Sequence, residues 1–200
     1  FQEPQQSTET QLWVVQADTL AESFSGEGDT AQRMTVIQSQ GKDRQTFAPL
    51  TLRQAAAALA KGEPLLIPAL SVGEAGLAFA GFALYQDGAI TRWLTGPAAL
   101  GAALLSGEKI HWTGSLGEEA LTLQSTGCQV HPVWEGGRVV GLDLRCRLEG
   151  VLTGGWTGEA TDPAPLERET AQAMLQALDQ LQAAGADAAG LLGRAGLSNP

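Results

Sequence analysis

The feature that most constrains this fold is a pair of long extended runs separated only by Glu135, Gly136 and Gly137. In the second run, every other position is apolar, namely Val140, Leu142, Leu144, Cys146 and Leu148. Charged residues occupy positions between them, namely Asp143, Arg145, Arg147 and Glu149. A period of two predicts an antiparallel strand with one buried face. Together with the run at residues 120–134, it predicts a long β-hairpin that turns at the glycine pair.

The rest of the chain alternates predicted strands with predicted helices. A second hairpin is expected over residues 77–94, with shorter strands at 11–17, 64–70 and 109–114. Helices are expected at Thr51–Gly62, after Gly96-Pro97, at residues 163–184, and briefly before the C-terminus. In the longest helix, the spacing predicts a buried stripe of Ala171, Met174, Leu175, Leu178 and Leu181 against the sheet. The fold class is therefore α+β, an antiparallel or mixed sheet with long hairpins, covered by a long C-terminal helix and shorter helices.

Charge excludes two classes of partner. The 200 residues carry a net charge of −10 and contain only three lysines, with no cluster of Lys and Arg. Such a surface repels nucleic acid and anionic lipid. No apolar run approaches the ~18 residues of a membrane span, so we expect no membrane-spanning segment.

The sequence carries none of the common catalytic or cofactor-binding motifs, and we expect no enzymatic activity, metal or cofactor. GxSxG, HExxH, the phosphate-binding GxxxxGK[ST] and GxGxxG are all absent. A zinc site would have to combine Cys128, Cys146, His111 and His131, whose spacing fits no compact zinc pattern. Cys128 and His131 lie three residues apart on a strand, so their side chains project from opposite faces and cannot form a nucleophilic pair.

The two cysteines instead raise the question of a cross-strand disulfide. If Glu135 faces Val139 across the turn, then Cys128 faces Cys146 directly and the two can bond. If Trp134 faces Arg138, then Cys128 faces Leu144 and the sulfur atoms lie on a diagonal. Both turns contain the glycine pair, so the sequence leaves the disulfide and two buried thiols open.

The tryptophans supply a second functional hypothesis, in which a small molecule binds an apolar groove. Five are present, namely Trp13, Trp93, Trp112, Trp134 and Trp156. Tryptophans more commonly pack in or at the edge of a core than line a ligand groove. The alternative is thus a secreted or lipid-anchored binding protein for a small molecule with a Trp-lined groove.

From Gly76 onward the order of motifs resembles the C-terminal domain of the Ger(x)C family, the C subunits of spore germinant receptors. The hairpin "GFALYQDGAITRWLTG" is followed by the helix "AALGAALLSG" and then by the long hairpin "CQVHPVWEGGRVVGLDLRCRLEG". The chain closes with a long helix and "AAGADAAGLLG", similar to the family's G-A-D-x-x-G-x-G. The basic residues that the family has in the long hairpin are largely replaced here.

The resemblance implies an organisation and a role. Residues 1–10 are expected to be a flexible leader, 11–75 a smaller segment similar to the family's middle region, and 76–200 the Ger(x)C-type C-terminal domain. A full first domain, which typical members carry, is not expected here. The implied role is that of a non-enzymatic, extracytoplasmic subunit in spore germination. It would be lipid-anchored to the spore inner membrane through a cysteine upstream of Phe1, with membrane-embedded A- and B-type subunits as partners.

Overall fold

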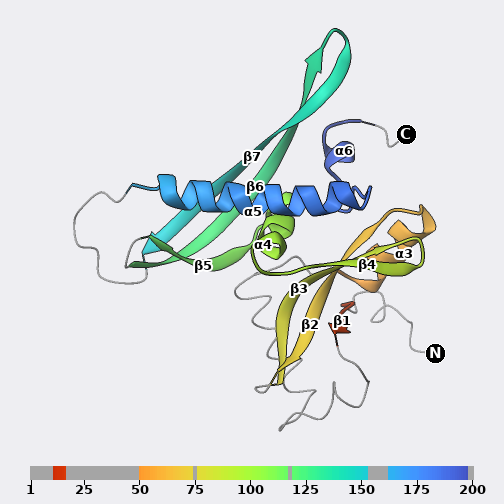
Figure 1. Ribbon diagram of the computed structural model, residues 1–200, viewed down its shortest axis with the longest axis horizontal. Helices are drawn as coiled ribbons and strands as arrows, with labels where there is room; N and C mark the ends of the chain where they lie inside the picture. The colour runs from red at the N-terminus through yellow and green to blue at the C-terminus, as the bar shows by residue number, and fades with distance from the viewer. Residues whose placement is uncertain (1–10, 17–49, 74–75, 117–118, 153–161, 198–200) are drawn as a thin grey trace, which may run out of the picture.

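The computed structural model describes residues 11–16, 50–73, 76–116, 119–152 and 162–197. These residues form two β-sheets with helices packed between and beside them (Figure 1). One sheet contains four strands in the order β1-β2-β3-β4, and the other contains three in the order β5-β6-β7. The predicted α+β class is therefore confirmed. The predicted leader and Trp156 lie outside the described residues.

The first sheet is mixed. Its strands are β1 (Val14–Gln16), β2 (Leu65–Gly73), β3 (Gly76–Gln86) and β4 (Ala89–Leu94). β1 runs parallel to β2, whereas β2, β3 and β4 pair antiparallel. The predicted β3–β4 hairpin turns at Asp87 and Gly88, both with positive φ, as a tight hairpin turn requires.

Helix α3 (Leu52–Ala60) starts where its capping residue predicts. The hydroxyl of Thr51 accepts from the amide of Gln54 at 3.2 Å. In return, Oε1 of Gln54 accepts from the amide of Thr51 at 2.8 Å. This reciprocal capping box satisfies two amide groups that the first turn leaves without partners.

The boundary expected between residues 75 and 76 lies between two paired strands. β2 pairs with β3 along its length, from Leu65 opposite Tyr85 to Gly73 opposite Gly76. The first sheet therefore takes strands from both sides of that boundary. The division into 11–75 and 76–200 stays a prediction about how the family's segments are arranged.

The second sheet contains the long hairpin. It comprises β5 (His111–Leu116), β6 (Glu119–Glu135) and β7 (Arg138–Leu152), all antiparallel. Glu135 pairs with Arg138, so the loop holds only Gly136 and Gly137, with φ of 55° and 79°. Neither of the two turns considered from the sequence is therefore correct. A two-residue turn with two positive φ angles matches the twist of the strands best, and the glycine pair permits it.

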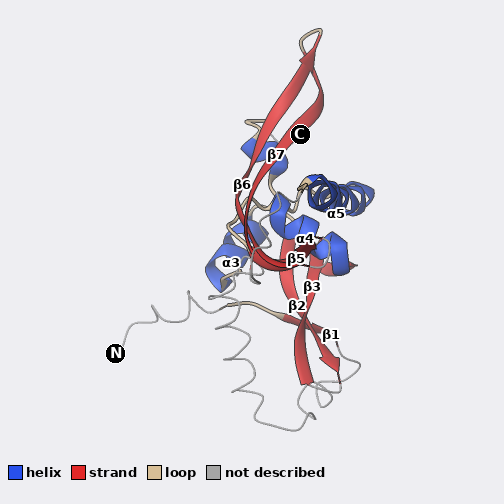
Figure 2. Cartoon of the chain, turned by 90° about the vertical axis from the view of Figure 1, so that its left-hand side faces the viewer, coloured by secondary structure: helices blue, strands red, loops and turns tan. Residues whose placement is uncertain are grey.

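The remaining helices fill the centre and one side of the molecule. They are α4 (Gly96–Leu105), α5 (Ala164–Ala183) and the one-turn α6 (Leu191–Arg194). Seven of the ten residues of α4 are buried, and α4 contacts β3, β4, β6 and α5. Figure 2 shows α4 at the level where the two sheets meet, with α5 beside it. α4 is thus the centre of the main core.

The stripe predicted for α5 is only partly correct. The helix buries Thr170, Ala173, Met174, Ala177 and Leu181. Leu178 is half-buried, whereas Ala171 and Leu175 are exposed. The main partner of α5 is α4, not the sheet. A Cβ atom on Gly101 of α4 would overlap the carbonyl of Ala173, so the helices approach closely and small side chains occupy the seam.

Candidate interaction site

The outer part of the β6–β7 hairpin extends away from the rest of the molecule. We call residues 129–145 the arm. Figures 1 and 2 both show this two-stranded ribbon rising beyond the helices and ending in the glycine turn. Among the described residues, no other element covers the ribbon near its end, so it exposes side chains that a central strand would bury.

The arm has one apolar face that continues from the core. On β6 this face carries Val130, Pro132 and Trp134, each two residues after the last, and their exposure increases outward. Val130 is 8% exposed, whereas Trp134 is 57% exposed. On β7 the partners are Leu144, Leu142 and Val139, of which Leu144 and Leu142 pack against the core. The apolar face thus extends past the point where the body can cover it.

The opposite face of the arm is polar. Gln129 and His131 are exposed there, opposite Arg145 and Asp143. Arg145 donates to the carboxylate of Asp143, with Nη2 to Oδ2 at 2.8 Å. A pair this exposed contributes between zero and about 1 kcal/mol. The polar face is therefore a solvated surface, whereas the apolar face is packed on the core at its base and exposed only at its outer end, at Trp134 and Val139.

Four apolar side chains at the tip of the arm are exposed, namely Val133, Trp134, Val139 and Val140. Trp134 and its partner Val139 continue the apolar face, whereas Val133, two residues after His131, projects from the opposite face. Val140 is an extra residue on β7, because Trp134 pairs with Val139 while Val133 pairs with Gly141. Such a bulge bends and twists a ribbon locally. Apolar clusters that include an exposed tryptophan are typical of surfaces that bind another molecule.

A set of hydrogen bonds attaches the base of the arm to the body. The guanidinium of Arg194 donates from Nη1 to the carbonyl of Leu105, at the end of α4, and from Nη2 to the carbonyl of Cys128. Asp187 positions this arginine by capping α6: Oδ1 accepts from the amide of Leu191 at 2.6 Å and Oδ2 from that of Leu192 at 2.9 Å. The aspartate of the "GAD" motif therefore organises the turn that holds Arg194.

A buried serine secures the neighbouring connection. Ser125 is 1% exposed. Its hydroxyl accepts from the amide of Ile110 at 3.1 Å and donates to the carbonyl of Glu108 at 3.0 Å. The segment that leads into β5 is thereby fixed to β6. Neither Ser125 nor Arg194 was predicted from the sequence, because their bonds join segments distant in the chain.

The structure brings the two cysteines together. Cys128 and Cys146 are directly opposite each other, Cys128 buried and Cys146 half-buried, and both are free thiols. Burial, and secondarily the neighbouring Cys128, raise the pKa of Cys146 from 9.0 to about 11. Of the two arrangements left open by the sequence, the one with the cysteines directly opposite is thus present, although a bulge and not a three-residue turn produces it.

The histidines do not join the cysteines. His131 is exposed on the polar face of the arm, away from Cys128, and His111 lies opposite Gln124. Within the described ranges, no three His, Cys, Asp or Glu side chains are grouped as metal ligands would be.

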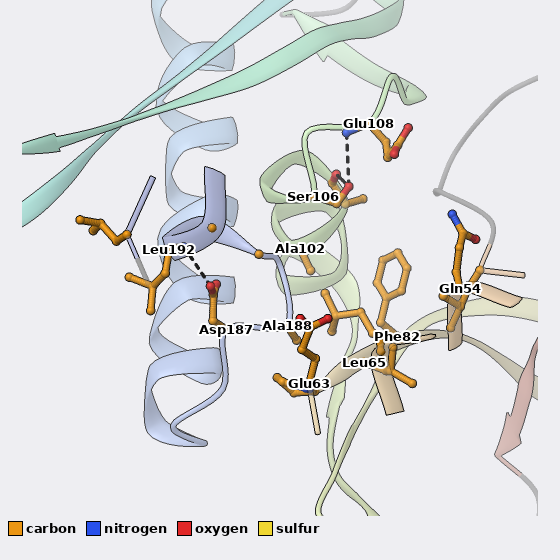
Figure 3. A pocket seen from close by; sticks show the side chains of 18 residues that line it. Gln54, Glu63, Leu65, Phe82, Ala102, Ser106, Glu108, Asp187, Ala188 and Leu192 are labelled. Atoms are coloured by element: carbon orange, nitrogen blue, oxygen red, sulfur yellow. Dashed lines mark hydrogen bonds between the residues drawn. The ribbon is translucent and has the colours of Figure 1, made fainter. Parts of the chain in front are cut away.

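A cavity of about 500 Å³ lies between the first sheet, the end of α4 and the turn before α6 (Figure 3). Its walls include Phe82, Ala102 and Leu192. Its polar side chains are largely engaged locally: Asp187 caps α6, and Ser106 donates to the carbonyl of Ala103 at 2.6 Å. The lining therefore offers a ligand few free polar groups to orient it.

The tryptophans form no common groove in the described part of the chain. Trp13 and Trp112 pack against the main core, Trp93 is half-buried on β4 and Trp134 is at the tip of the arm. Of these, Trp112 borders a smaller cavity of about 320 Å³ with Phe79 and Leu100. The Trp-lined groove of the alternative hypothesis is not favoured by this distribution.

No helix in the described ranges has the length and apolar character needed to cross a bilayer. No protein-family model matches the sequence, and no curated protein matches it either. Among solved structures, the crystal structure of the GerBC protein is similar, with a TM-score of 0.68 at 15% sequence identity. The match covers 97% of this chain and 61% of that chain, so the present chain spans about three fifths of GerBC. The chain therefore has a Ger(x)C-like fold.

Proposed function

We propose that this protein is a non-enzymatic subunit similar to the C subunit of a spore germinant receptor and acts in spore germination. The observation that carries the proposal is the likeness to GerBC over 97% of the chain. The motif order that resembles the Ger(x)C family supports it independently, because it is visible in the sequence alone.

In this role the protein assembles with other subunits and does no bond chemistry. We place the contact with the membrane-embedded A- and B-type subunits at the tip of the arm. Trp134 and its valine neighbours supply exposed apolar area, and a large aromatic side chain at the centre of a contact often dominates binding energy. The polar face of the arm would remain in solvent.

Charge favours a protein partner over a lipid surface. The whole chain carries −10, and on its arm Arg145 forms an ion pair with Asp143 of the same strand, while Glu135 lies opposite Arg138 at the turn. Anionic lipid attracts clusters of Lys and Arg, and the arm has none. We therefore propose an extracytoplasmic protein held at the membrane by an N-terminal lipid, with the arm directed at an apolar surface of a partner subunit.

The small-molecule alternative has weaker support. The cavity of about 500 Å³ has few free polar groups, and its lining contains no tryptophan. A binding protein would need convergent polar groups to fix a ligand's orientation.

Gene deletion in the source organism tests the proposal. Spores without the gene should lose germination in response to at least one nutrient, and a copy of the gene should restore it. Germination by a trigger that bypasses nutrient receptors serves as the control and should be unchanged. Deletion spores that respond normally to every nutrient would contradict the receptor role.

A further inference from the structure

The sequence leaves two registers open for the cysteine pair, and the structure resolves them by two bulges of opposite sense. Near the turn, the extra residue Val140 lies on β7. Nearer the body, Ser125 pairs with Leu148 while Cys128 pairs with Cys146, which leaves one extra residue on β6. Gly127 lies in that bulge with a φ of 126°, a conformation that side-chain-bearing residues rarely adopt.

Only the segment between the bulges sets the cysteines opposite each other. Without the extra residue Val140, the register of the turn would continue, and Cys128 would face Arg145. Because neighbouring residues on a strand project from opposite faces, Cys146 would then point away from Cys128. The bulge at Val140 thus aligns two thiols that the turn alone would separate, and the bulge at Gly127 restores the register of the turn beyond them.

The site is also fixed and open to small reagents. Arg194 binds the carbonyl of Cys128, so the backbone of one cysteine is attached to the body. A surface hollow of about 480 Å³ borders both cysteines, together with Arg145 and Arg147. The guanidinium groups of these two arginines favour the approach of an anionic reagent that reacts with thiols.

We propose that Cys128 and Cys146 are a modification site that forms an intramolecular disulfide by exchange with a small-molecule disulfide. One cysteine thiolate attacks the reagent, forms a mixed disulfide and releases one reagent thiolate. The second cysteine thiolate then attacks the protein sulfur, forms the Cys128–Cys146 bond and releases the other. The cysteine pair loses two electrons, the reagent gains them, and the two cysteine protons end on the two released thiols.

Each cysteine acts once as the nucleophile in this sequence, whichever reacts first. The thiolate of Cys146 is therefore needed in one of the two steps, and its pKa of about 11 keeps it scarce at neutral pH. Where that step limits the rate, cross-linking should accelerate about tenfold per pH unit below pH 11. The inference does not depend on the proposed function, although an extracytoplasmic location would preserve such a bond.

The test is incubation of the folded, full-length chain with oxidised and reduced glutathione, followed by intact mass analysis and peptide mapping. The wild-type chain should lose two hydrogen atoms and yield one cross-linked peptide pair. Cys146→Ser should instead retain one glutathione on Cys128.

A matched variant tests the register. The double variant Arg145→Cys, Cys146→Ser moves the second thiol to the preceding residue on β7, whose side chain is exposed. This double variant should form mixed disulfides without a cross-link, because Cys128 and position 145 then lie on opposite faces. A wild-type chain that accumulates only mixed disulfides, or that does not react, would overturn the proposal. A cross-link in the double variant would overturn the bulged register on which it rests.

Discussion

The helical centre of the molecule and the arm use apolar side chains in opposite ways. In α4, seven of the ten residues are buried, and Gly101 lets the backbone of α5 approach until no Cβ atom would fit. In the arm, Trp134 and three valines lie exposed on a two-stranded ribbon that no other described element covers at its tip. The difference teaches that the centre determines stability, whereas apolar area at the tip of the arm adds little to folding and is available for a partner.

The largest effect is expected at the closest helix contact. Gly101→Ala places a Cβ against the carbonyl carbon and oxygen of Ala173, which are backbone atoms and cannot rotate away. We expect a loss of about 4 kcal/mol or more in the free energy of unfolding, because overpacking against backbone is relieved only by separating the helices.

The arm provides the matched control. A Cβ atom on Gly141 would have no other atom within 4 Å, and the Gly141→Ala variant should change stability by less than about 0.5 kcal/mol. Urea unfolding of both variants measures the comparison. Equal effects of the two substitutions would show that the centre and the arm are not distinct.

The second effect compares two leucines on α5. Leu181 is 3% exposed and packs in the main core, whereas Leu175 is 59% exposed. Leu181→Ala should cost about 2–5 kcal/mol, and Leu175→Ala less than about 0.5 kcal/mol. Thermal and urea unfolding would detect both. A large loss for Leu175→Ala would mean that α5 turns a different side toward α4.

A smaller effect is expected at the base of the arm, where the two regions meet. The raised pKa of Cys146 means that the folded protein holds this proton more tightly than the unfolded chain. Stability of the reduced protein should therefore be unaffected below pH 9 and should fall as pH rises from 9 to 11. We expect a loss of about 1 kcal/mol, because solvent near this half-buried group screens part of the shift.

The measurement is urea unfolding of reduced wild type and Cys146→Ser at pH 8, 9, 10 and 11. Subtracting the Ser variant removes the contribution of every other titrating group. A difference that does not change with pH would contradict the burial of Cys146.

Patterns within single elements were predictable from the sequence. The alternation at Val140–Leu148 gave the correct strand, and Thr51 with Gln54 marks the start of α3, because both depend on neighbours a few residues apart. The opposition of Cys128 and Cys146 was one of two registers left open.

Features that depend on distant contacts were not predictable. The bulges at Gly127 and Val140 offset each other along one hairpin, and nothing in a period of two indicates where a residue is added. Leu175 fits the spacing of a buried stripe. However, α4 approaches α5 closely at Gly101, so Ala173 and not Leu175 lies in the contact between the two helices. From the sequence, Arg194 is indistinguishable from a solvated surface charge. In the fold it donates to the carbonyl groups of two residues distant in the chain.

The central claim is that the tip of the arm binds a partner and does not stabilise the fold. Trp134→Asp tests this claim, and Leu175→Asp is its control. The two side chains are equally exposed, at 57% and 59%, but Trp134 lies on the arm and Leu175 on helix α5. The measurement is binding of the tagged, full chain to detergent-solubilised A- and B-type subunits from the source organism. We predict that Trp134→Asp weakens binding at least about tenfold while both variants keep the wild-type melting temperature and Leu175→Asp binds normally. Unchanged binding by Trp134→Asp, or equal weakening by both variants, would contradict the account.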